Sequence, residues 1–138
     1  MPGRQLLYMD ASALVKRLKL ERESAALDAY LSQARAAQCV QVTSELAFTE
    51  VPRALWRAGP GALAEARGLL EQLETIPLTR DILDRAATLL PGERVRSLDA
   101  LHLASALGLD HELQALVSYD ARMLRAAAQL SLTISSPS

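Results

Sequence analysis

The 138-residue sequence predicts an α/β fold in which a mostly parallel sheet of four to five short strands carries helices on both faces. Short apolar runs alternate along the chain with longer segments whose apolar residues recur at helical spacing. Half of the residues are hydrophobic and 22% are charged, which is typical of a globular chain rather than a disordered one. We therefore expect a single domain over residues 1–138, with a frayed tail at the last few residues.

The predicted strands are short apolar runs, as expected for strands buried on both faces of a parallel sheet. The first is QLLYM and the second is CVQV. The sequence places strands at residues 5–9, 39–42, 75–78, 113–117 and 132–134.

The predicted helices begin near capping residues and end at glycine or proline. Ser12 stands near the start of the first helix, Thr43 and Ser44 are expected to cap the third, and Ser97 to cap the sixth. Gly59, Pro60 and Gly61 are expected to end the third helix. The helices are predicted at residues 11–19, 24–37, 45–59, 62–73, 79–92, 97–108 and 120–130.

Charge and cysteine content exclude several classes of protein. The formal net charge of −1 gives no global attraction to nucleic acid or membrane, so a nucleic-acid partner would need a local patch. Cys39 is the only cysteine, which excludes an intrachain disulfide and a cysteine-rich zinc site. The sequence has no long apolar span and no leader with a cleavage site, so we expect a cytoplasmic protein without a membrane partner.

Four acidic residues are expected at one edge of the sheet, where parallel α/β folds bind ligands. Asp10 ends the first strand and Asp120 follows the fourth. Asp99 lies in the first turn of the helix over 97–108, and Glu50 lies on the helix after the second strand. Four close carboxylates repel unless they are protonated or neutralised by a cation, and oxygen ligands favour Mg²⁺ or Mn²⁺. Such a site is suited to phosphodiester hydrolysis.

Each acid also has a structural interpretation. Asp10 and Asp120 could cap the helices that follow them, and Asp99 could complement a helix dipole. Glu50 could be a solvated surface acid. Position at one sheet edge favours the joint site over four separate roles.

Four segments resemble the signature segments of PIN-domain proteins and, more narrowly, VapC-type toxins of bacterial toxin–antitoxin systems. They are YMDASALVK, TSELAFTEVPRAL, SLDALHLASAL and LVSYDARMLRAA, in this order, and the resemblance runs from Leu6 to about Ala128. It implies a compact α/β fold and an Mg²⁺- or Mn²⁺-dependent endoribonuclease that cleaves RNA with metal-activated water. It also implies a cognate VapB-like antitoxin and a homodimer.

The resemblance assigns the family's catalytic acids to this chain residue by residue. It implies that Asp10, Asp99 and Asp120 bind the metal and that Glu50 positions metal or water. Ser12 and Ser118 match hydroxyl positions that would orient carboxylates or bound water; their alternative role is capping. The catalytic residues implied are Asp10, Glu50, Asp99 and Asp120.

Pro52 leaves the direction of Glu50 open. A proline inside a helix removes a hydrogen bond and clashes with the preceding turn, so we expect a kink near residues 48–50 or a junction of two short helices. Glu45, about one turn earlier, could then face the site instead. The family motif favours Glu50. His102 shares a helix face with Asp99, and we expect a structural role for it, because Mg²⁺ prefers oxygen ligands.

Two surface features are candidate contacts for partners. Lys16, Arg17 and Lys19 follow Asp10 closely and Arg96 precedes Asp99, so these four residues could hold RNA phosphates. Charge runs are usually solvated helix faces, which is the alternative interpretation of these residues. Trp56 lies in a predicted helical hairpin, where it could contact the antitoxin or pack within the chain.

Two other functions compete with the ribonuclease. In a phosphotransfer or phosphatase domain, Asp10 would be a nucleophile, but YMDAS lacks the second acid of a D-x-D motif and no lysine follows Lys19. In a non-catalytic PIN-like module, the protein would hold RNA or a protein without cutting. The presence of all four acids argues against that module.

Overall fold

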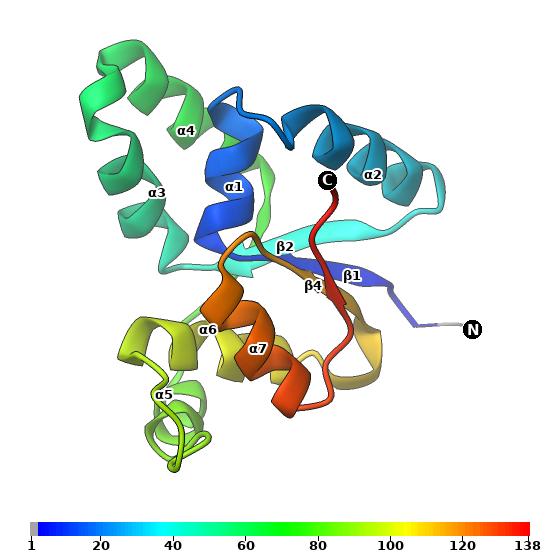
Figure 1. The fold of residues 1–138 in the computed structure, drawn as a ribbon, viewed down its shortest axis with the longest axis vertical. Helices are drawn as coiled ribbons and strands as arrows, with labels where there is room; N and C mark the ends of the chain where they lie inside the picture. Colours follow the sequence, from blue (N-terminus) through cyan, green and yellow to red (C-terminus); the bar gives the residue numbers. More distant parts are fainter. Residues whose placement is uncertain (1–2) are drawn as a thin grey trace.

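A computed structural model describes residues 3–138 as a five-stranded sheet covered by helices on both faces, which confirms the predicted fold class (Figure 1). The strand order is β3-β2-β1-β4-β5, and each neighbouring pair is parallel. The strands are β1 (Leu6–Met9), β2 (Val40–Ser44), β3 (Glu74–Ile76), β4 (Leu113–Val117) and β5 (Ile134–Ser135).

Within residues 3–138, seven α-helices connect and cover the strands. Short 3₁₀ turns follow two of these helices, at Trp56–Ala58 after the third and at Asp110–Glu112 after the sixth. The helices are α1 (Ala11–Leu18), α2 (Ser24–Ala36), α3 (Ala47–Leu55), α4 (Pro60–Gln72), α5 (Arg80–Ala87), α6 (Ser97–Leu107) and α7 (Ala121–Gln129). None of them is long and apolar enough to cross a bilayer.

Strand β1 lies at the centre of the sheet and sets its two faces. Successive side chains of a strand point to opposite faces. Leu7 and Met9 accordingly pack into one buried cluster with residues of α1–α4, whereas Leu6 and Tyr8 pack into a second cluster with residues of α6 and α7. Figure 1 shows α1–α4 on one side of the sheet and α5–α7 on the other.

The order in which strands are added to the sheet reverses at β1, although all strands are parallel. It builds β2 and β3 outward on one side of β1, and then returns to place β4 directly beside β1 on the other side. Such a reversal creates a crevice outside the carboxyl ends of the two central strands. The residues that follow Met9 and Val117 therefore lie at the position where this fold binds ligands.

The predicted helix starts lie within two residues of the observed ones, but three predicted capping residues are wrong. Thr43 and Ser44 belong to β2 instead of capping α3, because Thr43 is buried in the sheet and its hydroxyl donates to the Met9 carbonyl at 2.7 Å. Ser44 accepts a hydrogen bond from the Leu46 amide, in the turn that directly precedes α3. The residue before α6 is Arg96, so Ser97 is already helical and does not cap.

The hairpin of α3 and α4 also differs from the prediction. Helix α3 runs as one helix through Pro52, rather than as two short helices that meet there. Gly59 ends the turn after α3 with a φ of 94°, a conformation that residues with a side chain rarely adopt. Pro60 begins α4, where its missing amide costs no helical hydrogen bond.

Candidate active site

Asp10 stands at the carboxyl end of β1 and caps the N-terminus of α1. Its Oδ1 accepts a hydrogen bond from the Ala13 amide at 3.0 Å, so the predicted capping role is present. The residue is 3% exposed, which is unusual for a carboxylate. A buried charge of this kind requires compensating donors.

Two serine hydroxyls supply those donors. Ser12 donates to Asp10 Oδ1 at 2.6 Å, and Ser118 donates to Oδ2 at 2.5 Å. Burial raises the pKa of Asp10, and the hydrogen bonds from Ser118, Ser12 and Ala13 oppose that rise. The family resemblance implied that both serines orient carboxylates or bound water, and in the structure both donate to Asp10.

Asp120 meets the same serine from the end of β4. Its amide donates to Ser118 Oγ at 3.0 Å, so one hydroxyl connects the segments that carry Asp10 and Asp120. Asp120 also caps α7 by accepting from the Arg122 amide at 2.9 Å. The two acids thus lie at adjacent strand ends, as the topology requires.

Asp99 lies in the first turn of α6 and is half-buried. Burial raises its pKa, and repulsion from Asp120 and then from Asp10 raises it further. Asp99 therefore lies within electrostatic reach of both. The three acids come from β1, β4 and α6, and negative charge concentrates at this edge of the sheet.

Glu50 is held by a buried histidine. His102 Nε2 lies 2.6 Å from Glu50 Oε1, and His102 Nδ1 lies 2.7 Å from the Tyr8 hydroxyl. Tyr8 is fully buried, and burial raises the pKa of its phenol well above the usual range, so the phenol keeps its proton. That proton needs an acceptor, and Nδ1 supplies one. His102 then carries its proton on Nε2 and donates it to Glu50.

This contact bears on the choice between Glu45 and Glu50. Glu45 is exposed, whereas the carboxylate of Glu50 is turned toward α6 and its His102. We predicted a structural role for His102 from the sequence, and its contact with Glu50 adds the role of orienting that acid. The spacing of His102 three residues after Asp99 was the available signal.

The donor set suits a hard divalent cation. Asp10, Asp99 and Asp120 offer only carboxylate oxygens, the ligands that Mg²⁺ and Mn²⁺ prefer. Their mutual repulsion, visible at Asp99, is what a cation would offset. Among residues 3–138, however, no three His, Cys, Asp or Glu side chains already stand at metal-binding spacing.

The four basic candidates differ in how their charges are used. Lys16 forms ion pairs with Glu23 at 2.6 Å and Glu21 at 3.4 Å. Arg17 is half-buried and donates to the Gln41 side chain at 2.9 Å. Lys19 is exposed at the end of α1. Arg96 is exposed and lines a cavity of about 560 Å³ that also touches Asp99.

Trp56 lines a second cavity, of about 420 Å³, between α3 and α4. We call this cavity the hairpin groove. Trp56 is 70% exposed, so it is not part of the core of this chain. The groove is lined by Phe48, Pro52, Trp56, Leu63, Ala64, Arg67 and Leu70.

Comparison with known proteins gives a consistent result. Residues 7–129 match the PIN domain family. Ribonuclease VapC46 of Mycobacterium tuberculosis is 41% identical over 132 residues, which cover 96% of this chain and 98% of that protein. Ribonuclease VapC47 of the same species is 38% identical over 133 residues, which cover 96% of this chain and 97% of that protein.

Solved structures share the fold at lower identity. VapBC2 from Rickettsia felis, bound to a DNA fragment from its promoter, superimposes with a TM-score of 0.75 at 13% identity, covering 97% of this chain and all of that one. VapC20 from Mycobacterium tuberculosis, a toxin that cleaves the sarcin–ricin loop, gives 0.69 at 17% identity, covering 87% and 94%. At such identities the likeness concerns the fold alone.

The convergence of the acids can be tested without any metal. Asp120→Asn should lower the pKa of Asp99, because the substitution removes a negative charge that raises it. The pKa is measured by NMR titration of ¹³C-labelled carboxylates in metal-free buffer. Asp84→Asn, on the exposed face of α5, is the matched control and should leave the Asp99 pKa unchanged. Equal effects of the two substitutions would place Asp120 out of reach of Asp99.

The hydrogen bonds from Tyr8 through His102 to Glu50 make a second prediction. Tyr8→Phe should cost about 1–3 kcal/mol of unfolding free energy in urea, because it leaves the buried Nδ1 of His102 without a donor. In the unmodified protein, ¹⁵N NMR should find the His102 proton on Nε2. Tyr30→Phe, at a half-buried tyrosine of α2, should cost less. A proton on Nδ1, or no difference between the two variants, would contradict the assignment.

Proposed function

The chain belongs to the PIN-domain family and is a VapC-type ribonuclease toxin of a toxin–antitoxin system, and from that premise we propose how its residues cut RNA and meet their partners. The proposed reaction is metal-dependent hydrolysis of RNA phosphodiester bonds at the edge formed by Asp10, Asp99 and Asp120. The observation that carries it is the shared hydroxyl of Ser118, which bridges Asp10 and the amide of Asp120 beside a half-buried Asp99.

Each residue has a proposed role. Asp10, Asp99 and Asp120 hold the cation, with Ser12 and Ser118 fixing the carboxylate of Asp10. When bound, Mg²⁺ or Mn²⁺ would act as a Lewis acid that activates water and offsets negative charge on the scissile phosphate. His102 holds Oε1 of Glu50 and leaves Oε2 to accept a hydrogen bond from the attacking water. No covalent enzyme intermediate is needed.

The proposed protein partner is a cognate VapB-like antitoxin whose apolar segment lies in the hairpin groove. The groove offers Phe48 and Trp56 as exposed aromatic anchors, at 44% and 70% exposure. Helix-in-groove recognition uses apolar anchors of this kind. Arg67 adds a positive charge at the wall. The homodimer that the family resemblance implies stays a prediction.

The proposed site predicts the loss of cleavage on a single isosteric change. Asp99→Asn keeps the shape of the side chain but removes a ligand charge, so cleavage of total cellular RNA should fall by more than the ~10–100-fold that a residue supporting a metal ligand costs. Cleavage is measured on antitoxin-free protein with Mg²⁺, with Mn²⁺ and with chelator. Asp84→Asn should cleave like the unmodified protein.

The outcomes separate the competing mechanisms. Cleavage retained by a folded Asp99→Asn protein rejects this site. An acyl-phosphate trapped on Asp10 favours the phosphotransfer mechanism. A folded protein that cuts nothing with either metal supports the non-catalytic module.

The groove makes a prediction about the antitoxin. Trp56→Ala should weaken antitoxin binding by about 2 kcal/mol or more, as expected for an aromatic hot spot, while hardly changing the melting temperature, since the indole is exposed. Binding is measured by calorimetry. Leu20→Ala is the control, because Leu20 is 91% exposed and lies outside the groove. A large loss of stability with unchanged affinity would assign Trp56 to the core.

A further inference from the structure

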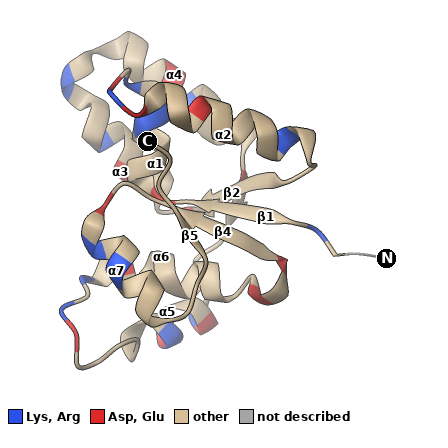
Figure 2. Cartoon of the chain, turned by 45° about the vertical axis from the view of Figure 1, so that its right-hand side comes forward, with Lys and Arg blue, Asp and Glu red and all other residues tan. Residues whose placement is uncertain are grey.

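A basic cavity lies directly beside the candidate active site. Its volume is about 560 Å³, and Asp99 forms part of its wall. Two segments distant in sequence supply the positive charge: the loop before α6 and the helix α7. Figure 2 shows basic segments on α7 facing the adjacent loop. The arginines are Arg94 and Arg96 from the loop and Arg122 and Arg125 from α7. We call this the arginine cavity.

The charges of these arginines are not neutralised within the protein. All four side chains are exposed, and none forms an ion pair with a carboxylate among residues 3–138. Besides Asp99, the one acid on the lining is Glu93, which accepts a hydrogen bond from Gln129 at 3.3 Å. A chain with a net charge of −1 thus carries a local excess of positive charge next to its acidic edge.

The basic group on α1 contrasts with this cavity. Lys16 is committed to Glu21 and Glu23, and Arg17 to Gln41. Residues already paired must give up those contacts before they bind a phosphate, whereas the arginines of the cavity have none to give up. Of the two basic groups nearest the acids, the one on the α6–α7 side therefore offers four unpaired guanidinium groups, whereas on α1 only the ammonium of Lys19 has no side-chain partner among residues 3–138.

We propose that the arginine cavity binds the phosphates of single-stranded RNA immediately beside the bond that is cut. The proposal rests on the proposed ribonuclease function and deepens it. Guanidinium groups match phosphate oxygens with two parallel hydrogen bonds. Because Asp99 belongs both to the cavity wall and to the acidic edge, a strand in the cavity leads directly to the site of hydrolysis.

The lining also defines what kind of RNA contact this is. The lining residues include no aromatic side chain on which a base could stack. Contacts made by arginine to phosphate position a strand without reading its sequence. The cavity therefore contributes affinity and register at these nucleotides, and base selection has to come from elsewhere on the surface.

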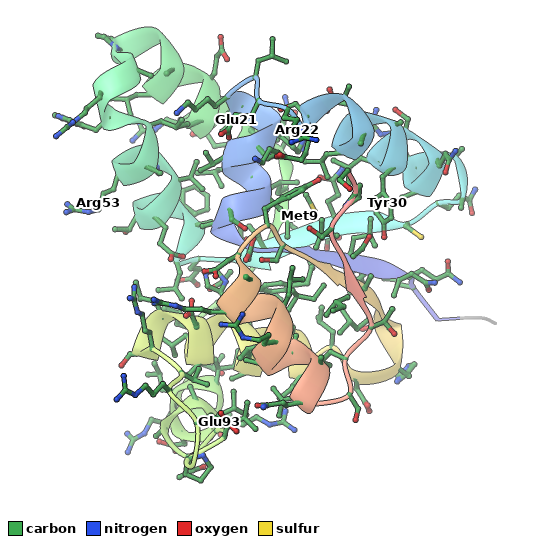
Figure 3. All side chains as sticks on the ribbon, viewed as in Figure 1. Met9, Glu21, Arg22, Tyr30, Arg53 and Glu93 are labelled. Carbon is green, nitrogen blue, oxygen red and sulfur yellow. The ribbon has the colours of Figure 1, made fainter. Side chains whose placement is uncertain are left out.

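The test compares two matched pairs of substitutions in binding. The probe is a fluorescein-labelled single-stranded oligouridylate, followed by fluorescence anisotropy across a series of salt concentrations. All protein variants carry Asp10→Asn, and the buffer contains chelator, so that the RNA is not cut during the measurement. Gels confirm that the RNA stays intact. The test pair is Arg122→Gln with Arg125→Gln. The control pair is Arg53→Gln with Arg57→Gln, on α3 and the turn after it, where Figure 3 shows Arg53 projecting outward.

The arginine cavity pair should weaken binding and flatten its salt dependence. Each phosphate contact on a single strand contributes about 0.7 to the slope of log K against log salt, so the test pair should reduce the slope by about 1.4. The control pair should leave the slope unchanged. Because all four arginines are exposed, melting temperatures should not change.

Several outcomes would overturn the proposal. Equal slopes for the two pairs would show that the cavity does not hold RNA. Unchanged RNA binding combined with weakened antitoxin binding would assign the cavity to an acidic segment of the antitoxin. Failure of the proposed ribonuclease function would give a different result from failure of the cavity proposal. The protein without Asp10→Asn would then cut no RNA with either metal, whatever the slopes. Cutting with equal slopes would reject the cavity alone.

Discussion

The carboxylate of Asp10 imposes the constraint on which the rest of this site depends. A carboxylate that is almost completely buried must be solvated by the protein, or it loses its charge. Its donors are the Ser12 hydroxyl, the Ser118 hydroxyl and the Ala13 amide. They come from α1 and from the segment after β4, 108 residues away from Asp10 in the case of Ser118. Satisfying this one charge therefore requires the whole central part of the sheet to be assembled.

The same contacts explain how the other acids reach the edge. Ser118 accepts from the Asp120 amide while it donates to Asp10, so the two strand ends cannot move apart without breaking a buried hydrogen bond. Asp99 comes from α6, whose buried face packs against the sheet through Leu103. Burial raises the pKa of Asp99, and repulsion from Asp120 and Asp10 raises it further, so the fold brings like charges together against their repulsion. Folds tolerate such electrostatic strain mainly at functional sites.

The sequence predicted the fold class and the strand-end acids because both depend on local patterns. Apolar runs and helical periodicity require no knowledge of distant contacts. Thr43 failed as a predicted cap because its hydroxyl is taken by the Met9 carbonyl of a neighbouring strand, a tertiary contact. The contact that favours Glu50 over Glu45 is likewise made with His102, 52 residues away. A role for Arg122 and Arg125 could not be predicted from the sequence, because they form a basic cavity only together with the loop before α6, which the fold places beside α7.

Capping and catalysis, which compete as interpretations of Asp10 and Asp120 in the sequence, are compatible in the structure. A carboxylate has about four lone-pair positions on two oxygens, and capping a helix uses one of them. The Arg122 amide engages Oδ1 of Asp120 and leaves Oδ2 available. Capping also fixes the side-chain torsions of Asp120, so its free Oδ2 points in a defined direction, whereas both oxygens of Asp10 are already held by donors. Because α1 and α7 both start at the carboxyl edge of neighbouring strands, their caps aim two carboxylates at one crevice. The helix caps are thus the means by which this fold preorganises the proposed site, and a substitution that preserved capping while removing charge would separate the two roles.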